Sequence, residues 1–97
     1  FVHVLHEILP GNIFITDRDH VVASSDPGQI GKKIDCIDYN ITKALEGEDI
    51  LESRRAISPI RADGYILGTV GLQRDNLDLT ALKIIKVTAS IIGKQLE

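Results

Sequence analysis

The sequence is poor in sulfur-containing and aromatic residues and has no long apolar run. Its 97 residues include one cysteine, Cys36, no methionine or tryptophan, two phenylalanines and two tyrosines. One cysteine cannot form a disulfide within the chain, which excludes a disulfide-stabilised small domain and favours a reducing, cytoplasmic compartment. We interpret Cys36 as a small buried or half-buried residue rather than a redox sensor. A transmembrane helix would need about 18 consecutive apolar residues, and the sequence has no such run.

Clustered positive charge is also missing from the sequence. Eleven lysines and arginines stand against fourteen acidic residues, which gives a net charge of −3. Because binding to nucleic-acid phosphates needs grouped cations, we expect no direct nucleic-acid contact by this domain. His3 and His6 have a spacing that places both on one face of a helix, but no third or fourth ligand lies near them. The sequence therefore predicts no metal site.

The residue patterns that support catalysis or cofactor binding are absent as well. Ser24 and Ser25 lack the surrounding sequence of a nucleophile elbow. Asp17 and Asp19 flank a tight turn, where aspartate commonly hydrogen-bonds the local backbone. The segment 28–32 fails the spacing of a phosphate-binding loop. We therefore predict that the chain is not an enzyme, and that it has no catalytic residue and no cofactor.

The strongest positive signal is a central strand at Tyr65–Gln73. It follows the turn sequence Ala62-Asp63-Gly64, in which glycine supplies the positive φ that tight hairpins need. Apolar side chains alternate onto both of its faces, so we expect this strand to lie inside a sheet. Ile66, Val70 and Leu72 fall on one face. Gly68 and Gly71 lack side chains where another group must approach closely.

The other segments alternate between extended and helical patterns, with turn residues between them. Strands are predicted at Asn12–Asp17, Val21–Ser25 and Ser53–Arg61, helices at Phe1–Leu9, Asp38–Glu46 and from about Asp78 to the end, and a polar connection at Glu48–Glu52. Asp38 is the expected N-cap of the middle helix and Gly47 its C-cap. The order helix, hairpin, helix, hairpin, helix predicts an α+β domain with a central antiparallel sheet and flanking N- and C-terminal helices, the layout of GAF and PAS sensor domains.

The last helix carries more apolar surface than one side of a small sheet can cover. Its main apolar stripe recurs at alternating spacings of three and four, as in a coiled coil. That stripe consists of Leu82, Ile85, Ala89, Ile92 and Leu96. Because exposed apolar area is unfavourable, we expect a homodimer formed through these residues. The alternative is that both apolar stripes of this helix are buried within a single chain.

Three segments resemble one known family of sensor domains. The sequences ITDRDHVVASS (Ile15–Ser25), PIRADGYILGTVGL (Pro59–Leu72) and VTASIIGKQLE (Val87–Glu97) together resemble the C-terminal GAF-type domain of AbrB-type transition regulators, such as stage V sporulation protein T. The resemblance implies a cytoplasmic regulatory domain of a sporulation regulator. In that family the domain follows a DNA-binding domain, dimerises through the helices that flank its sheet, and senses a small molecule. We accordingly expect residues 1–97 to be a single sensor domain of a longer transcription regulator.

A second resemblance competes with the first. The segments Asn12–Asp17, Val21–Ile34 and Ala44–Glu48 are similar to the N-terminal recognition domain of sugar-diacid utilisation regulators. That resemblance implies recognition of a sugar diacid or another carboxylate. Both resemblances imply a domain that binds a small molecule.

The sequence also suggests where such a ligand would bind. We expect a pocket between sheet and helix, lined by Phe14, Thr16, Ala23, Ser25, Ile57 and Thr69. Arg55 and Arg61 share a strand face, and a guanidinium in the pocket would bind the carboxylate of an acidic metabolite. The alternative is that both arginines are solvated at a rim.

Three functions remain open at this point: a ligand-sensing regulatory domain, a structural dimerisation module whose pocket is filled by its own side chains, and a small enzyme. We favour the first. A cavity of roughly 300 Å³ or more would separate it from the second.

Overall fold

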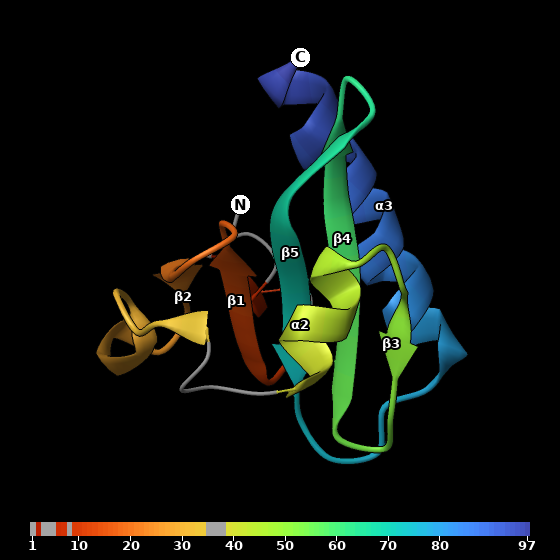
Figure 1. The fold of residues 1–97 in the computed structure, drawn as a ribbon. Helices are drawn as coiled ribbons and strands as arrows, with labels where there is room; N and C mark the ends of the chain where they lie inside the picture. The colour runs from red at the N-terminus through yellow and green to blue at the C-terminus, as the bar shows by residue number, and fades with distance from the viewer. Residues whose placement is uncertain (1, 3–5, 8, 35–38) are drawn as a thin grey trace.

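The structure, a computed structural model, describes residues 2, 6–7, 9–34 and 39–97. The described chain forms an α+β fold with one antiparallel sheet, shown in Figure 1. Its strands are β1 (Asn12–Thr16), β2 (Val21–Ser24), β3 (Ile50–Leu51), β4 (Arg55–Ala62) and β5 (Tyr65–Gln73), in the spatial order β2-β1-β5-β4-β3. The predicted α+β class and antiparallel sheet are confirmed.

The predicted central strand is the middle strand of this sheet. β5 pairs antiparallel with β1 on one side and with β4 on the other. The hairpin that joins β4 to β5 turns at Asp63 and Gly64, whose φ values of 53° and 82° are those of a two-residue turn with both central residues left-handed. The position, bounds and turn of this strand agree with the sequence prediction.

A bulge in this hairpin corrects one detail of the prediction. Ile60 pairs with Gly68 but Arg61 pairs with Ile66, so one residue of β5 is extra at that point. Beyond the bulge, Ile66 lies near Gly47, which follows the helix α2 (Tyr39–Leu45). A Cβ at Gly47 would lie 3.6 Å from Ile66 Cδ1. The prediction that Ile66 shares the face of Val70 and Leu72 is therefore wrong, because the extra residue breaks the two-residue period.

Helices cover both faces of the sheet. Figure 1 shows α2 (Tyr39–Leu45) on the near side and α3 (Leu79–Leu96) on the far side. The core on the α3 side contains Val2, Leu9, Ile13, Ala56, Ile60, Val70, Leu72, Ala81, Leu82, Ile85, Ala89 and Ile92. The core on the α2 side contains Phe14, Val21, Ile34, Ile41, Ala44 and Ile57. Two cores are possible because successive residues of each strand point to opposite faces.

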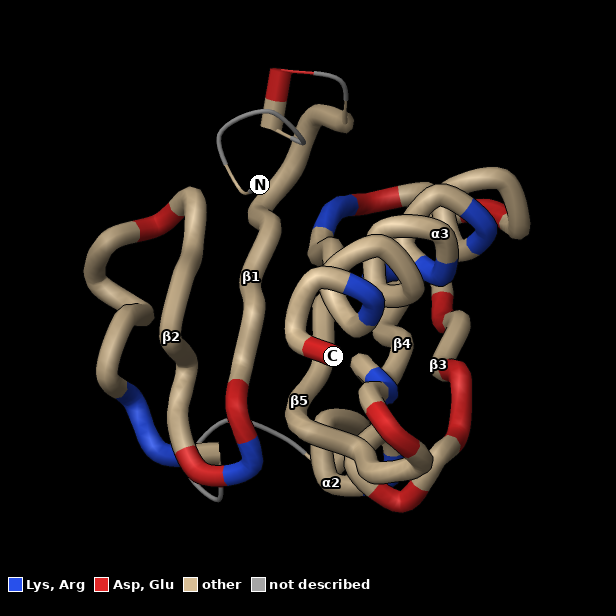
Figure 2. Tube along the Cα trace, turned by 90° about the horizontal axis from the view of Figure 1, so that it is seen from above, with Lys and Arg blue, Asp and Glu red and all other residues tan. Residues whose placement is uncertain are grey.

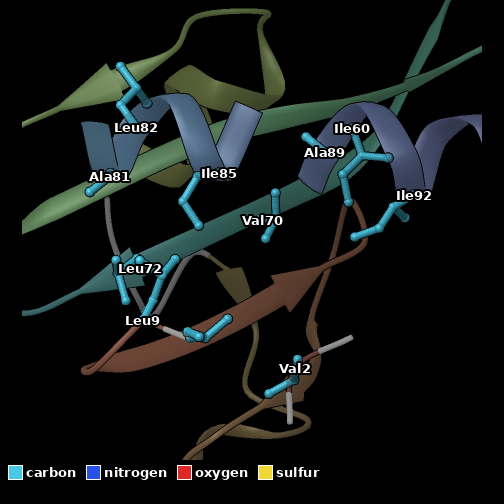
Figure 3. Packing of buried hydrophobic residues seen from close by; sticks show 12 residues of the cluster. Val2, Leu9, Ile60, Val70, Leu72, Ala81, Leu82, Ile85, Ala89 and Ile92 are labelled. Carbon is cyan, nitrogen blue, oxygen red and sulfur yellow. The ribbon is translucent and has the colours of Figure 1, made fainter. Parts of the chain in front are cut away.

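The predicted dimer stripe of α3 packs mostly against its own sheet. Leu82, Ile85, Ala89 and Ile92 are buried, and Figure 3 shows Ile85 directed toward Val70 and Leu72 of β5. The fifth member, Leu96, is 58% exposed. The apolar side chains of α3 that remain open to a second copy are Leu79, Val87, Ile91 and Leu96. Dimerisation itself stays a prediction.

The ends of both described helices follow from local residues. Asp78 caps α3, since its Oδ1 accepts a hydrogen bond from the Ala81 amide at 3.0 Å. After α2, the amides of Gly47 and Glu48 donate to the carbonyls of Ala44 and Lys43, and Gly47 has a φ of 107°. These two bonds form a Schellman motif, so the predicted glycine C-cap is confirmed. The predicted N-cap Asp38 and the cysteine Cys36 lie outside the described residues.

One segment differs from its predicted structure, and another can be compared with its prediction only in part. The expected polar connection at Glu48–Glu52 contains the short edge strand β3, whose Ile50 pairs with Ile57 of β4. That prediction was wrong because pairing with β4, rather than local composition, makes the segment extended. Of the predicted helix at Phe1–Leu9, Val2, His6 and Glu7 are helical, and residues 1, 3–5 and 8 lie outside the described residues.

Candidate ligand-binding site

A cavity of about 630 Å³ opens on the α2 side of the sheet. Its lining comes from strands β1, β2, β4 and β5, from helix α2, and from the segments that follow β2 and β5. Among the described residues, those that line it are Asn12, Phe14, Val21, Asp26, Gln29, Lys32, Ile41, Arg54, Arg55, Gln73, Arg74 and Asp75. Apolar and charged groups therefore meet in one space.

The apolar wall is built on a glycine in the central strand. Phe14 of β1 pairs across the sheet with Gly71 of β5, and its ring occupies the space where a side chain at Gly71 would be. A Cβ at Gly71 would overlap the distal atoms of this ring. Phe14 is 7% exposed and packs with Val21 and Ile41, which also line the cavity. The absence of a side chain at position 71 thus determines the shape of this wall.

The wall that follows β2 is held by a short turn. The 3₁₀ helix η1 (Pro27–Gln29) is capped by Asp26, whose carboxylate accepts from the Gly28 amide at 3.1 Å and from Gln29 Nε2 at 3.4 Å. The chain then returns to β2, because the Gly31 amide donates to the Val21 carbonyl at 2.8 Å. Gly31 has a φ of 89°, which suits glycine. This return places Lys32 at the cavity.

The opposite wall contains three arginines. Arg54 and Asp75 form an ion pair with 3.0 Å between Nε and Oδ1, but both side chains are about three-quarters exposed, so the pair contributes little to stability. Arg74 donates from Nη1 to the Pro10 carbonyl at 3.1 Å. Arg55 is half-buried on β4. Among the described residues, the Lys32 ammonium on the facing wall makes no hydrogen bond or ion pair.

The structure brings two of the eight predicted site residues to this cavity, Phe14 and Arg55. Thr16 of β1 and Thr69 of β5 are paired and buried, and their hydroxyls hydrogen-bond each other at 2.7 Å. Ile57 is fully buried in the core on the α2 side.

The remaining three predicted residues lie elsewhere. Ser25 accepts from the Ile13 amide and donates to Asn12 Oδ1, both at 2.9 Å, so its hydroxyl organises the end of β1. Ala23 is half-buried against the core on the α3 side. Arg61 donates to the Gly47 carbonyl at 2.9 Å and lines a second cavity of about 340 Å³ beside α3. Arg55 and Arg61 therefore do not face the same cavity, although they share a strand.

Sequence reasoning missed Asn12, Lys32 and Arg74 as lining residues. Each lies near the end of a strand or in a loop, and no local pattern shows that these positions meet. A partial signal existed for Lys32, since it follows Gly31 directly in a segment rich in turn residues. Arg74 comes immediately after the central strand, and its side chain donates to the Pro10 carbonyl just before the neighbouring strand β1.

The described part of the chain holds no group of three or more His, Cys, Asp or Glu side chains that could bind a metal ion. Within the same residues, no helix combines the length and apolar character needed to cross a membrane. The polar groups that the described residues bring to the cavity are guanidinium, ammonium, amide and carboxylate groups, beside an apolar wall. No protein-family model matches the chain, and a comparison with curated proteins finds no match either.

Proposed function

We propose that this chain is a GAF- or PAS-like sensor domain that binds a small molecule and regulates an attached output domain in a bacterial transcription regulator. The cavity of about 630 Å³ carries this proposal. Ligand sites in proteins commonly measure about 300 to 1,000 Å³, and a purely structural module would fill this space with its own side chains. The resemblance of the sequence to regulator sensor domains supports the same function.

Hydrogen bonds around the cavity suggest how ligand binding would affect the N-terminal segment. Arg74, which lines the cavity, hydrogen-bonds the Pro10 carbonyl just before β1. Gly11 follows with a φ of 126°, and His6 Nδ1 lies 3.1 Å from the Gly11 carbonyl oxygen. A ligand that binds the Arg74 side chain would therefore change its hydrogen bond to Pro10, which holds the N-terminal segment at the start of β1.

The segment that follows β5 lines the cavity and also leads directly into α3. The Arg74 amide donates to the Arg54 carbonyl at 3.2 Å, and the Leu77 amide donates to the Ser53 carbonyl at 2.9 Å. The N-cap of α3, Asp78, is the next residue. A ligand that fits one arrangement of this loop better than another would shift the population of α3 orientations by its difference in affinity. Pairing of two copies through the outer side of α3 would pass that shift to the output domain.

The test uses a cavity-filling variant and a matched control. Gln73 is exposed at the cavity and Gln95 is exposed on α3. A mixed library of neutral and charged metabolite-sized compounds is screened by ligand-observed NMR against the native chain, and hits are measured by titration calorimetry. We expect at least one hit whose affinity falls at least tenfold in Gln73→Trp and is unchanged in Gln95→Trp. A library without hits, or hits that Gln73→Trp leaves unaffected, would overturn the proposal.

A further inference from the structure

We propose that the ligand of this cavity is a small organic anion, whose carboxylate or phosphate group is attracted into the cavity by Lys32 and Arg74. This inference rests on the proposed ligand-binding function and adds to it the charge of the ligand.

The cavity is cationic in a chain that is acidic as a whole. Among the described residues, four cationic side chains line it, against two carboxylates, whereas the whole chain carries a net charge of −3. Elsewhere, acidic and basic residues are spread along the molecule, as Figure 2 shows. Cations gathered in a concave site raise the local concentration of anions, because the protein walls reduce the screening of their field.

The two carboxylates of the cavity already have partners. Asp75 pairs with Arg54, and both oxygens of Asp26 accept hydrogen bonds from the η1 turn. Arg74 donates only to the neutral carbonyl of Pro10 among the described residues, and the Lys32 ammonium has no partner there. These two cations therefore lack a counter-charge within the described chain. Both line the cavity, and an anionic group bound there would gain charge-assisted hydrogen bonds from cations that have no other counter-charge.

The rest of the ligand would lie on the apolar wall. Phe14, Val21 and Ile41 line the same cavity as the cations, so the site suits a molecule with an apolar portion as well as an anionic group. A free inorganic ion would leave this wall without a contact. Carboxylates and phosphate monoesters are both anionic hydrogen-bond acceptors, so either group suits the two cations. The experiment below distinguishes a carboxylate ligand from a phosphate ligand.

The experiment measures the affinity of four probes with the same ring. Benzoate and phenyl phosphate carry the two anionic groups, and benzamide and phenol are their neutral counterparts. Titrations followed by amide NMR give the dissociation constant of each and show whether the shifts include Phe14 and Ile41. We expect one of the two anions to bind at these residues at least tenfold more tightly than its neutral counterpart, and more weakly as ionic strength rises. Preference for benzoate identifies a carboxylate ligand, and preference for phenyl phosphate a phosphate ligand.

Charge-removing variants locate the anion within the cavity. Lys32→Gln and Arg74→Gln should each weaken binding of the preferred anion by roughly 10- to 100-fold, as expected for loss of a hydrogen bond between charged groups. Lys83→Gln, at an exposed position of α3, is the matched control and should leave the affinity unchanged. Circular dichroism and thermal melting confirm that each variant is folded before it is titrated.

The outcomes separate this inference from the function on which it rests. Neutral probes that bind at Phe14 as tightly as the anions would overturn the charge of the ligand while leaving a ligand site. Unchanged anion affinity in both Lys32→Gln and Arg74→Gln would likewise overturn it. Failure of the proposed function has a different signature, namely that no compound of the mixed library binds the cavity at all.

Discussion

Replacing Gly71 by alanine should destabilise the fold through one specific overlap, with the ring of Phe14. Gly71 lies in the interior of β5 and is not among the residues with positive φ, so its backbone would accept alanine. In a strand interior this change alone should be favourable by about 0.5–1 kcal/mol. The new Cβ, however, would overlap the distal atoms of the Phe14 ring, and overpacking of a core costs about 1–3 kcal/mol. The two terms together give a net loss of between about 0 and 2.5 kcal/mol in the free energy of unfolding.

A double-mutant cycle measures this overlap directly. Phe14→Leu shortens the side chain that Gly71→Ala would meet, so the double variant should be less destabilised than the sum of the single variants, by about 1 kcal/mol or more. Urea denaturation followed by circular dichroism gives the four free energies. For a domain of this size each kcal/mol also corresponds to about 4–8 °C in melting temperature.

The control for this cycle is another glycine. Gly64→Ala introduces the same methyl group where no atom lies within 4 Å, and its cost of about 1–2 kcal/mol arises only from the φ of 82°. Its effect should therefore add to that of Phe14→Leu without coupling. Additive effects of the Gly71 pair, or equal coupling in both glycine pairs, would show that overlap with Phe14 does not cause the loss of stability.

Four further predictions concern the core, a helix cap, a turn and the outer side of α3. Ile85→Ala should lower the free energy of unfolding by about 2–5 kcal/mol in urea denaturation, since Ile85 is fully buried, and a loss below 1 kcal/mol would contradict this packing. Asp78→Ala should cost about 1 kcal/mol in the same assay through loss of the α3 N-cap, whereas an unchanged midpoint would show that this cap is not needed. Hydrogen bonds from the His20 and Asp19 amides lower the pKa of Asp17 below its ordinary value of 3.8, so this stabilisation is present above that pH and lost as pH falls through the lowered pKa. The stability difference between the native chain and Asp17→Asn should accordingly be constant near neutrality and shrink below pH 3.8, and a constant difference at all pH values would count against it. If two copies pair through α3, the double variant Val87→Lys with Ile91→Lys should shift the mass measured by light scattering toward that of the monomer. The stability of the monomer should change by less than about 0.5 kcal/mol, because both side chains are exposed. A dimer that survives both changes uses another surface.

Local signals were sufficient for much of the fold. Tyr65–Gln73 is recognisable as a central strand because its apolar groups alternate onto both faces and a glycine turn precedes it. Gly47 and Asp78 were recognisable as helix boundaries because their conformational and hydrogen-bonding preferences act over one turn of chain. Such features depend on a few neighbouring residues, and the sequence contains all of them.

Features that depend on distant partners were not predictable in this way. Ile50–Leu51 is a strand only because Ile57 and Ala56 of β4 lie beside it. The spacing of the α3 stripe correctly identified an apolar face, but spacing cannot say whether a sheet or a second copy covers that face. In the structure, the sheet of the same chain covers its four buried members.

The candidate site was predictable only in part, for a similar reason. Phe14 was expected in a pocket between sheet and helix and Arg55 was expected to offer a guanidinium there, and both line the cavity. Arg61 shares the strand face of Arg55, yet it lies farther along β4 and donates to the Gly47 carbonyl instead. Lys32 and Arg74 come from loops far apart in sequence, and only the folded chain shows that they line one cavity.

The most direct test of the account is an amide NMR titration of the chain with a compound that binds the cavity. Binding there should be coupled to the connection before β1 and to the loop before α3. We predict chemical-shift changes at Phe14 that are accompanied, with the same dissociation constant, by changes at Gly11 and Leu77, while Gly64 at the far turn remains unchanged. Changes that occur at Phe14 but not at Gly11 or Leu77 would contradict the coupling, and binding without any change at Phe14 would contradict the site itself.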